Sequence, residues 1–338
     1  MIPKKIFIVP YRNRIQQKYF FSKFMTTVVL KHMTDYEIYF SHQSDERPFN
    51  RGASKNIGFL AVKSKYPNDY KNMTFIFNDV DTMPFTNLFS YETTPGIVKH
   101  YYGFTYALGG IVAIKGEDFE KINGYPCYWG WGNEDNCLQT RCLKNNIKID
   151  RSEFFSIGNP NILQLFDGIA RLINKSDAWR ASNDLGLDGL SSITQLKYNI
   201  DTTSDNANDN LYVVVSPRII YINIKTFNTL ISSSSETYHK YDLREPQIRI
   251  TQPNQLDMVI PTDKSPGSSI STIHDWTIIP EYTKESANSK KYQARPNTNI
   301  AKISPPGDIQ MKKINPLQHN IPNPLMRPKK NKKQLLFI

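Results

Sequence analysis

Two tryptophans and two glycines alternate over residues 129–132, and polar and acidic residues follow directly at 133–136. An indole ring offers a flat face on which a sugar ring can lie, and glycine lets a ligand come close to the backbone. Glu134 and Asp135 place two carboxylates beside that face. Because neighbouring carboxylates repel each other, the pKa of one can rise toward that of a general base. The alternative is a buried aromatic turn that begins a solvated helix over 136–144.

A second pair of carboxylates, Asp79 and Asp81, follows the apolar segment 73–77. In an extended turn, residues two apart point to the same side. Carboxylate oxygens suit Mg²⁺ and Mn²⁺, and such an ion neutralises a diphosphate leaving group. The pair therefore predicts a divalent metal site, although two aspartates at this spacing also occur in ordinary loops.

Arginines follow apolar segments in two further loops. One loop is Pro10-Tyr11-Arg12-Asn13-Arg14, and the other contains Arg51 after Phe49 and Asn50. A guanidinium group matches a phosphate in a bidentate geometry. The loops predict phosphate binding, and the alternative is that they are ordinary basic loops.

The elements that must position these residues alternate between strands and helices. Strands are predicted over 5–10, 36–40 and 73–77, and helices over 15–31 and 53–65. This alternation favours a parallel α/β sheet, in which ligands gather at the carboxyl ends of the strands. Further along, we predict a strand or hairpin over 104–114, helices over 117–122 and 136–144, and closing strands over 212–215 and 219–224.

The formal net charge of +11 is spread unevenly over the 338 residues. Residues 226–338 hold sixteen of the 42 basic residues, nine of the 31 acidic residues and twelve of the 21 prolines. Because such a composition buries little, we predict one domain over 1–225 and a largely disordered, basic, Pro/Ser/Lys-rich extension over 226–338. Its basic cluster at 327–333 could contact an acidic partner, nucleic acid or a membrane surface, or could only keep the extension solvated.

Cysteine usage and hydropathy indicate the compartment. Cys127, Cys137 and Cys142 form no CxxC pair, which argues against a disulfide framework and a zinc site. No signal peptide is evident, and no apolar run approaches the ~20 residues of a membrane span. The sequence therefore predicts a soluble, cytoplasmic protein with no membrane span.

Five short sequence motifs occur at residues 10–14, 77–81, 109–110, 123–126 and 129–136. Their order is that of the β-1,4-galactosyltransferase family of inverting glycosyltransferases, and the chain resembles this family over residues 5–215. The resemblance implies a GT-A type nucleotide-sugar-binding fold, with a mixed, mostly parallel sheet flanked by helices. The implied function is transfer of galactose or N-acetylgalactosamine from a UDP-sugar to a hydroxyl of a glycan or glycoconjugate acceptor, assisted by Mn²⁺ or Mg²⁺.

The resemblance also implies a role for each matching residue. Asp135 is the general base for the acceptor hydroxyl, Glu134 supports it, and Asp81 is the metal ligand. Asn136 and Tyr102 contact the acceptor, and Asn136 stands where many relatives have a third carboxylate. The residues implied to contact the donor are Pro10, Arg12, Arg14, Phe49, Arg51, Asp79, Ala107, Gly109, Gly110 and Trp131.

Two departures from the family affect the metal and the donor. Relatives supply a His metal ligand further along the chain, whereas 158–165 contains no His and no Met. We therefore expect weak metal binding, completed by water, Asn161 or Gln164, and the lid segment 166–187 is also poorly matched. Ala107 stands where galactosyl-transferring relatives have Tyr, and small residues occur there in relatives that transfer N-acetylgalactosamine. The alternatives are a catalytically silent carbohydrate- or nucleotide-binding relative and a nucleic-acid-associated protein.

Overall fold

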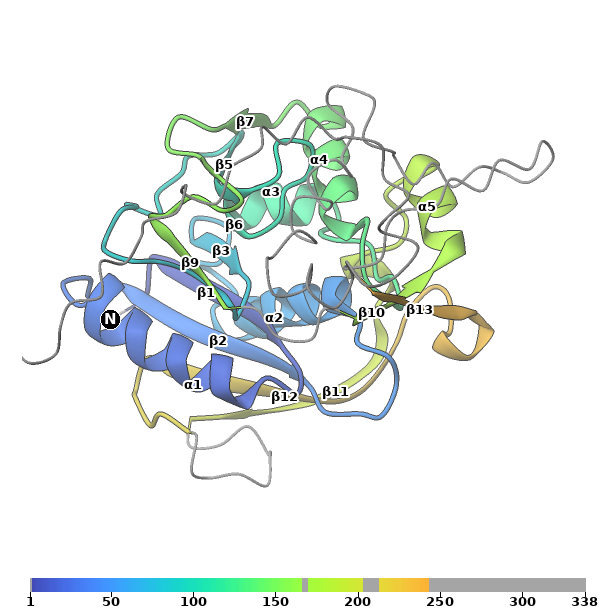
Figure 1. Cartoon of the computed structure of the whole chain (residues 1–338), viewed down its shortest axis with the longest axis horizontal. Helices are drawn as coiled ribbons and strands as arrows, with labels where there is room; N and C mark the ends of the chain where they lie inside the picture. The colour runs from blue at the N-terminus through green and yellow to red at the C-terminus, as the bar shows by residue number, and fades with distance from the viewer. Residues whose placement is uncertain (1, 166–169, 203–212, 243–338) are drawn as a thin grey trace, which may run out of the picture. The chain divides into compact units, whose positions relative to one another are not determined.

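The computed structural model describes residues 2–165, 170–202 and 213–242, and the fold is described for these residues alone. They form a mixed nine-stranded sheet in the order β11-β12-β2-β1-β3-β6-β5-β7, with β8 paired to β5 (Figure 1). The strands are β1 (Lys5–Tyr11), β2 (Tyr36–Gln43), β3 (Thr74–Asn78), β5 (Ile97–Gly103), β6 (Ile111–Lys115), β7 (Lys148–Asp150), β8 (Phe155–Ser156), β11 (Thr194–Asp201) and β12 (Ile219–Asn228). Strands β12, β2, β1 and β3 are parallel neighbours, whereas β6 and β11 run antiparallel to theirs. The mixed, mostly parallel sheet predicted for a GT-A fold is confirmed.

The central strand β1 is buried on both faces. Ile6 and Ile8 belong to one hydrophobic cluster, together with helix α2 (Arg51–Lys65), while Phe7 and Val9 belong to a second cluster with helix α1 (Ile15–Phe24). Successive side chains of a strand point to opposite faces, so a strand covered on both sides needs an unbroken apolar run. The two helices therefore cover opposite faces of the sheet.

Shorter elements complete the described part of the chain. Two further helices of the body are α3 (Gly116–Lys121) and α4 (Glu134–Lys144). Two small antiparallel pairs are β4 (Thr82–Pro84) with β9 (Ile162–Gln164), and β10 (Ala170–Asn174) with β13 (Tyr238–Asp242). Within the predicted lid, residues 170–187 contain β10 and helix α5 (Lys175–Ser182). Over the described ranges, each helix is too short or too polar to span a bilayer.

Three predicted elements differ from the structure. The helix predicted over 15–31 is α1 followed by a π-helix at Met25–Val29, where the Thr27 hydroxyl donates to the Lys23 carbonyl at 2.7 Å. Such back-bonding by threonine distorts a helix. The strand or hairpin predicted over 104–114 is β6 preceded by a loop, and residues 213–215 of the predicted strand 212–215 are not extended in a sheet.

The predicted domain boundary after residue 225 falls inside strand β12. Phe227 is fully buried, and its ring stacks on that of Trp129 with centroids 5.3 Å apart. Residues 226–242 are therefore folded with the domain, and the predicted start of the extension is corrected accordingly. The remainder of the predicted extension, 243–338 with its basic cluster, lies outside the described residues.

Candidate active site

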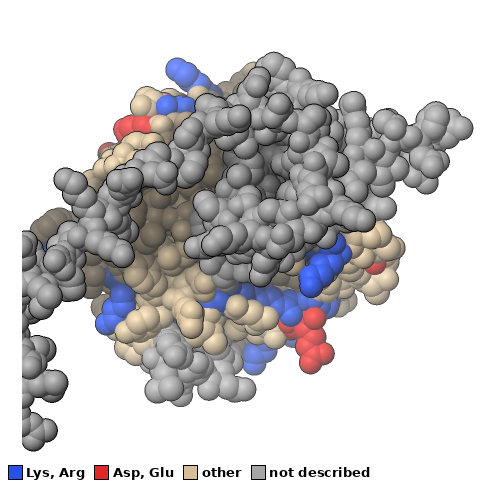
Figure 2. All heavy atoms as spheres, viewed as in Figure 1, with Lys and Arg blue, Asp and Glu red and all other residues tan. Residues whose placement is uncertain are grey.

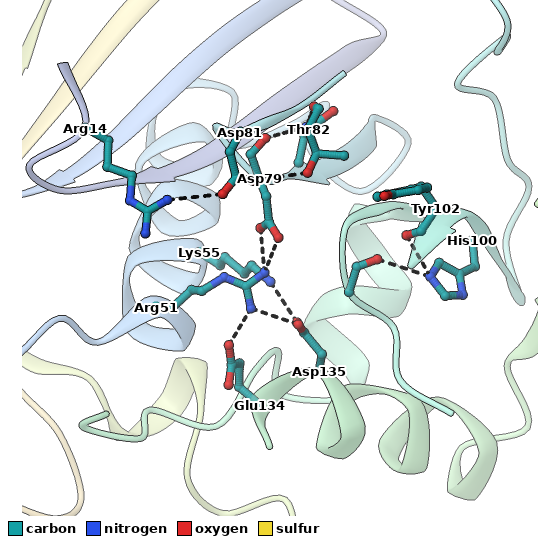
Figure 3. A network of polar contacts seen from close by, with 12 residues as sticks. Arg14, Arg51, Lys55, Asp79, Asp81, Thr82, His100, Tyr102, Glu134 and Asp135 are labelled. Atoms are coloured by element: carbon teal, nitrogen blue, oxygen red, sulfur yellow. Dashed lines mark hydrogen bonds and ion pairs between the residues drawn. The ribbon is translucent and has the colours of Figure 1, made fainter. Parts of the chain in front are cut away.

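Six of the predicted residues lie close together, because several strands of the sheet end at this place (Figure 3). Arg14 follows β1, Arg51 begins α2 after β2, Asp79 and Asp81 follow β3, and Glu134 and Asp135 begin α4. These residues come from four separate segments of the sequence. Their meeting at the carboxyl ends of parallel strands is the arrangement in which α/β proteins bind ligands.

Arg51 lies at the centre of this site (Figure 3). Its Nη2 bonds both carboxylate oxygens of Asp79, at 2.6 Å for Oδ2, and its Nη1 bonds Asp135 Oδ2 at 2.8 Å. Nη1 also bonds the carboxylate of Glu134. Burial acts to lower the pKa of Arg51, but the three carboxylates raise it well above its usual value. Arg51 is thus a permanent cation that gathers three carboxylates.

Asn50 fixes where α2 begins and so where Arg51 lies. Its Oδ1 accepts the backbone N–H of Ala53 at 2.8 Å, which is an N-cap hydrogen bond. Its Nδ2 donates to the carbonyl of Cys127 at 2.9 Å. A capping Asn stabilises a helix by roughly 0.5–2 kcal/mol, and the second bond ties the start of α2 to the loop that leads to Trp129.

Asp135 is bonded by two cations from one face of α2. Arg51 bonds Oδ2, and Lys55, four residues later, donates to Oδ1 at 2.9 Å. Residues four apart lie on the same side of a helix. Burial acts to raise the pKa of Asp135, but Arg51 and Lys55 lower it to about 2. For Asp135 this corrects the expectation that a neighbouring carboxylate raises its pKa, because two cations outweigh the repulsion.

Gly109 lies directly against this carboxylate. A Cβ atom at position 109 would be 2.6 Å from Asp135 Oδ2, so a larger residue would displace the carboxylate. The preceding residue, Leu108, donates its backbone N–H to the Asp135 carbonyl at 3.0 Å. A predicted donor-binding glycine and the predicted base are therefore in contact.

His100 holds the turn that presents Gly109. Its Nδ1 accepts from Arg151 Nε at 3.0 Å, so Nε2 carries the proton and donates to the carbonyls of Tyr102 and Gly109 at 3.0 and 3.1 Å. Burial and the Arg151 charge lower the pKa of His100 to about 4, so the ring is neutral at neutral pH. Sequence reasoning missed both residues, because only the fold brings His100 to Gly109.

Asp81 is bonded by a different arginine. Its Oδ2 accepts from Arg14 Nη1 at 3.1 Å, and its Oδ1 accepts from the Thr82 hydroxyl at 3.1 Å. Burial and the charge of Asp79 raise the pKa of Asp81 to about 6. An ionised carboxylate in such surroundings is stabilised by any further cation that reaches it.

Gln164 reaches the same region from β9. It pairs with Thr82 across the β4–β9 ladder, and directly opposed residues have Cβ atoms about 4.5–5.5 Å apart. Its Oε1 accepts from the Tyr102 hydroxyl at 2.6 Å. Asp81, Thr82 and Gln164 all offer oxygen, the ligand type that Mn²⁺ and Mg²⁺ prefer. Among the described residues, no three His, Cys, Asp or Glu side chains are grouped to hold a metal.

Three predicted donor-binding residues that precede Arg51 in the sequence have different environments. Arg12 bonds the carbonyl of Arg47 and lies 3.9 Å from Asp45. Pro10 is buried within β1, and Phe49 is half-buried in the loop before α2. Their contacts with a donor stay predictions.

The two tryptophans of the 129–132 stretch have different environments. Trp129 is 1% exposed and belongs to the core, whereas Trp131 is half-buried and its backbone N–H donates to the Leu172 carbonyl at 2.7 Å. The buried-turn alternative therefore fits Trp129 alone. Trp131 is the residue of the pair that the structure leaves partly accessible.

The loop before β6 carries further predicted residues. Ala107 is 5% exposed, and the carbonyl of Gly110 accepts the Asp79 N–H at 3.1 Å. The Asn136 amide donates to the Tyr106 carbonyl at 3.3 Å. Tyr102 is 1% exposed and bonded to Gln164, so its predicted contact with an acceptor stays a prediction.

Comparison with known proteins decides the family. A family model described as the N-terminal region of glycosyl transferase group 7 matches residues 2–94, and one described as the N-terminal domain of galactosyltransferase matches 96–164. The chain belongs to glycosyltransferase group 7, the β-1,4-galactosyltransferase family. The matched ranges contain Asp81, Asp135 and every other predicted site residue of this group 7 chain.

Curated relatives of the group 7 chain are similar over part of its length. Human β-1,4-galactosyltransferase 4 is 33% identical over 157 residues, which are 43% of this chain and 44% of the relative. Bovine β-1,4-galactosyltransferase 1 is 31% identical over 160 residues, 44% of this chain and 39% of the relative. The chain thus spans less than half the length of these relatives.

Solved structures similar to the group 7 chain include the catalytic domain of Drosophila β-1,4-galactosyltransferase 7 in complex with xylobiose. It is 20% identical with a TM-score of 0.49, covering 66% of this chain and 94% of that one. A single-residue mutant of the Drosophila protein in complex with manganese, UDP-Gal and xylobiose matches with a TM-score of 0.48, 20% identity and the same coverage.

Proposed function

We propose that this chain is an inverting glycosyltransferase that moves galactose or N-acetylgalactosamine from a UDP-sugar to a hydroxyl of a sugar acceptor. The observation that carries the proposal is the cluster in which Arg51 joins Asp79 of the aspartate pair to Asp135. This cluster supports the proposal because it joins an arginine suited to phosphate, one aspartate of the pair proposed for the metal ion, and the carboxylate proposed as the general base. The curated relatives named β-1,4-galactosyltransferases support the transfer of galactose.

The proposed reaction needs few steps from the protein. The acceptor oxygen attacks the anomeric carbon of the donor sugar while its proton passes to the Asp135 carboxylate. The bond from that carbon to the diphosphate breaks, and the electron pair leaves with UDP. Arg51 and Arg14 supply positive charge for the diphosphate, and Gly109 lets the reacting groups lie close to Asp135.

A divalent ion would supply charge neutralisation for the leaving diphosphate. The oxygen atoms of Asp81, Thr82 and Gln164 fit Mn²⁺ or Mg²⁺ in type, because these ions prefer oxygen ligands. We infer that Asp81 is the charged ligand and that Gln164 provides a neutral one. A site with one carboxylate binds such ions weakly.

We expect Mn²⁺-dependent UDP binding to be lost in Asp81→Ala. In Thr82→Val the hydroxyl that bonds Asp81 disappears while the shape stays, so Mn²⁺ affinity should fall by about 10- to 100-fold. Calorimetric titration of UDP and Mn²⁺ measures both effects, with the exposed Thr86→Val as the matched control. Tight stoichiometric Mn²⁺ binding that survives Asp81→Ala would show that other ligands hold the metal.

Donor choice is expected to depend on Ala107. A small residue there leaves space beside the 2-position of the donor sugar, which an N-acetyl group needs. Overpacking costs about 1–3 kcal/mol, which is roughly 5- to 150-fold in rate. We therefore expect UDP-N-acetylgalactosamine to be used at least as well as UDP-galactose, and Ala107→Tyr to move the preference toward UDP-galactose by that factor.

The ratio of kcat/KM for the two donors, measured in the natural protein and in Ala107→Tyr, tests this expectation. A bulky neighbour that filled the space beside Ala107 would cancel its effect, and the neighbours in question are Tyr106, Leu108 and Trp179. Leu108 is packed in the core, Tyr106 stacks on Phe104 with centroids 5.1 Å apart, and Trp179 is 57% exposed. If the natural protein strongly prefers UDP-galactose and the substitution leaves the ratio unchanged, Ala107 does not select the donor.

The second candidate function is binding of a nucleotide or carbohydrate without catalysis. The observation that favours it is the bonding of both Asp135 oxygens by Arg51 and Lys55, because a carboxylate with a pKa of about 2 is a weak base. A screen of UDP-sugars against simple glycoside acceptors with Mn²⁺ present separates the two functions. Binding without transfer or hydrolysis of any donor would favour the silent relative.

Contact of the chain with an acidic partner or nucleic acid stays a prediction for the basic cluster at 327–333. In the described part of the chain, Lys and Arg side chains lie in separate groups on the face that Figure 2 shows, among acidic and uncharged residues. A cytoplasmic location likewise stays a prediction.

A further inference from the structure

Lys55 is the least exposed charged side chain of the described site. Its side chain is 2% exposed, compared with 16% for Arg51 and 19% for Asp135. Its ammonium group lies 4.2 Å from the ring centroid of Tyr125 and donates to Asp135 Oδ1 at 2.9 Å. Lys55 therefore faces the proposed base from the protein interior, whereas Arg51 faces it from the more accessible side.

The two cations divide the two oxygens of Asp135 between them. Arg51 takes Oδ2 and Lys55 takes Oδ1. Removing a lysine from water is costly, and a buried ion pair contributes little to stability compared with apolar residues of the same volume. The position of Lys55 is therefore better explained by what it does to Asp135 than by stability of the fold.

We propose that Lys55 is a positioning residue that holds Oδ1 of Asp135 and so leaves Oδ2 as the atom that accepts the proton. The role rests on the function proposed above. When Arg51 turns to the donor diphosphate, Oδ2 loses its partner while the bond to Lys55 keeps the carboxylate in place. The acceptor O–H bond then breaks toward Oδ2, the new glycosidic bond forms, and UDP leaves with its electron pair.

Every charged or titratable group that faces Asp135 enters the expected pH dependence. Arg51 and Lys55 face it from α2, Glu134 precedes it on α4, and Asp79 shares Arg51 with it. His100 acts on it electrostatically from β5 and is neutral above about pH 4, as its lowered pKa shows. Tyr125 also interacts with it electrostatically, and burial raises the pKa of Tyr125 well above its usual value, so that its phenol stays uncharged. Of these groups, Lys55 is the cation that stays bonded to Asp135 once Arg51 binds phosphate.

The test compares Lys55→Met, which keeps the length of the side chain, with Lys55→Arg, which keeps the charge. The midpoint of the Asp135 carboxyl titration is measured by ¹³C NMR of aspartate-labelled protein, assigned through Asp135→Asn. An adjacent cation lowers a carboxyl pKa by about 1–3 units, so the midpoint should rise by about 1–3 pH units in Lys55→Met and stay low in Lys55→Arg. Lys63→Met, on the same helix and paired with Glu120, is the control.

Kinetics provide the second measurement. The acid limb of the kcat/KM profile should move upward in Lys55→Met by the same amount, with kcat reduced and the KM for the donor nearly unchanged. Lys55→Gln, which keeps a hydrogen-bond donor without charge, replaces Lys55→Met if that variant does not fold. Superimposable midpoints in the natural protein and both neutral variants would overturn the proposal for Lys55. A natural protein that binds no UDP-sugar would instead overturn the proposed function, and the NMR midpoint would still test Lys55.

Discussion

Replacing Asp135 by asparagine should lower the rate of sugar transfer by about 10²- to 10⁴-fold, which is the usual contribution of a general base. The amide has nearly the shape of the carboxylate and accepts a hydrogen bond from Lys55, but it does not take the acceptor proton. UDP binding and the fold should persist, because Arg14 and Asp81, which are proposed for the diphosphate and the metal ion, are bonded to each other and not to Asp135. Single-turnover transfer and UDP titration measure the two properties separately.

Glu134→Gln is the matched comparison for Asp135→Asn. Glu134 is 3% exposed and bonds Arg51, so it supports the site but is shielded from an acceptor. Its substitution should reduce transfer by less than that of Asp135. A loss below tenfold in Asp135→Asn, or a larger loss in Glu134→Gln, would assign the base elsewhere.

The positions of the site loops could be predicted because they depend on short-range patterns. The apolar runs before Arg12 and Asp79 form β1 and β3, and both runs are buried along their whole length. Parallel strands with buried runs place the residues that follow them at one edge of the sheet. Arg14, Arg51, Asp79 and Asp135 could be assigned to one site in this way, but the partner that each one bonds required the fold.

Arg51 shows what the sequence leaves open. The family resemblance implies that Arg51 contacts the donor, whereas the structure bonds it to three carboxylates. Lys55 could have been found, since it follows Arg51 by four residues and must share its helix face. His100 and Arg151 could not, because their contact joins residues that lie 51 positions apart.

The folded residues after 225 were missed for a related reason. Composition averaged over 226–338 describes a weakly hydrophobic segment, and the average hides Phe227, the buried apolar residue of β12 that follows residue 225. The strand pairs in parallel with β2, which lies far earlier in the chain. Phe227 then supplies the surface on which Trp129 stacks, a contact that no local pattern indicates.

Replacing Arg51 by methionine should lower the free energy of unfolding by about 3–5 kcal/mol at pH 7, the cost of removing one partner from a buried ion cluster. The cluster is mostly shielded, with side-chain exposures of 16% for Arg51, 25% for Asp79 and 4% for Glu134. Without Arg51, three carboxylates face each other with Lys55 as the remaining cation bonded to Asp135. Their mutual repulsion then opposes folding.

The effect of Arg51→Met should depend on pH in a direction that follows from proton linkage. In the natural protein the pKa of Asp135 is lowered to about 2, so its stabilising contribution is complete above pH ~4 and disappears as the pH falls toward 2. In the variant, repulsion raises the pKa of Asp135 instead, so the native state binds more protons than the unfolded state above pH ~4. The stability of the variant therefore decreases as the pH rises, and the deficit is larger at pH 7 than at pH 5.

Urea unfolding at pH 5 and pH 7 measures this deficit. Lys63→Met is the control, because Lys63 is 38% exposed and its pair with Glu120 contributes about 0–1 kcal/mol. The same preparation tests donor binding, which should weaken strongly when the cation proposed for the diphosphate is removed. An Arg51→Met protein with a deficit that is equal at the two pH values would show that the carboxylates do not repel each other, and natural stability at pH 7 would show that Arg51 is not what holds them together.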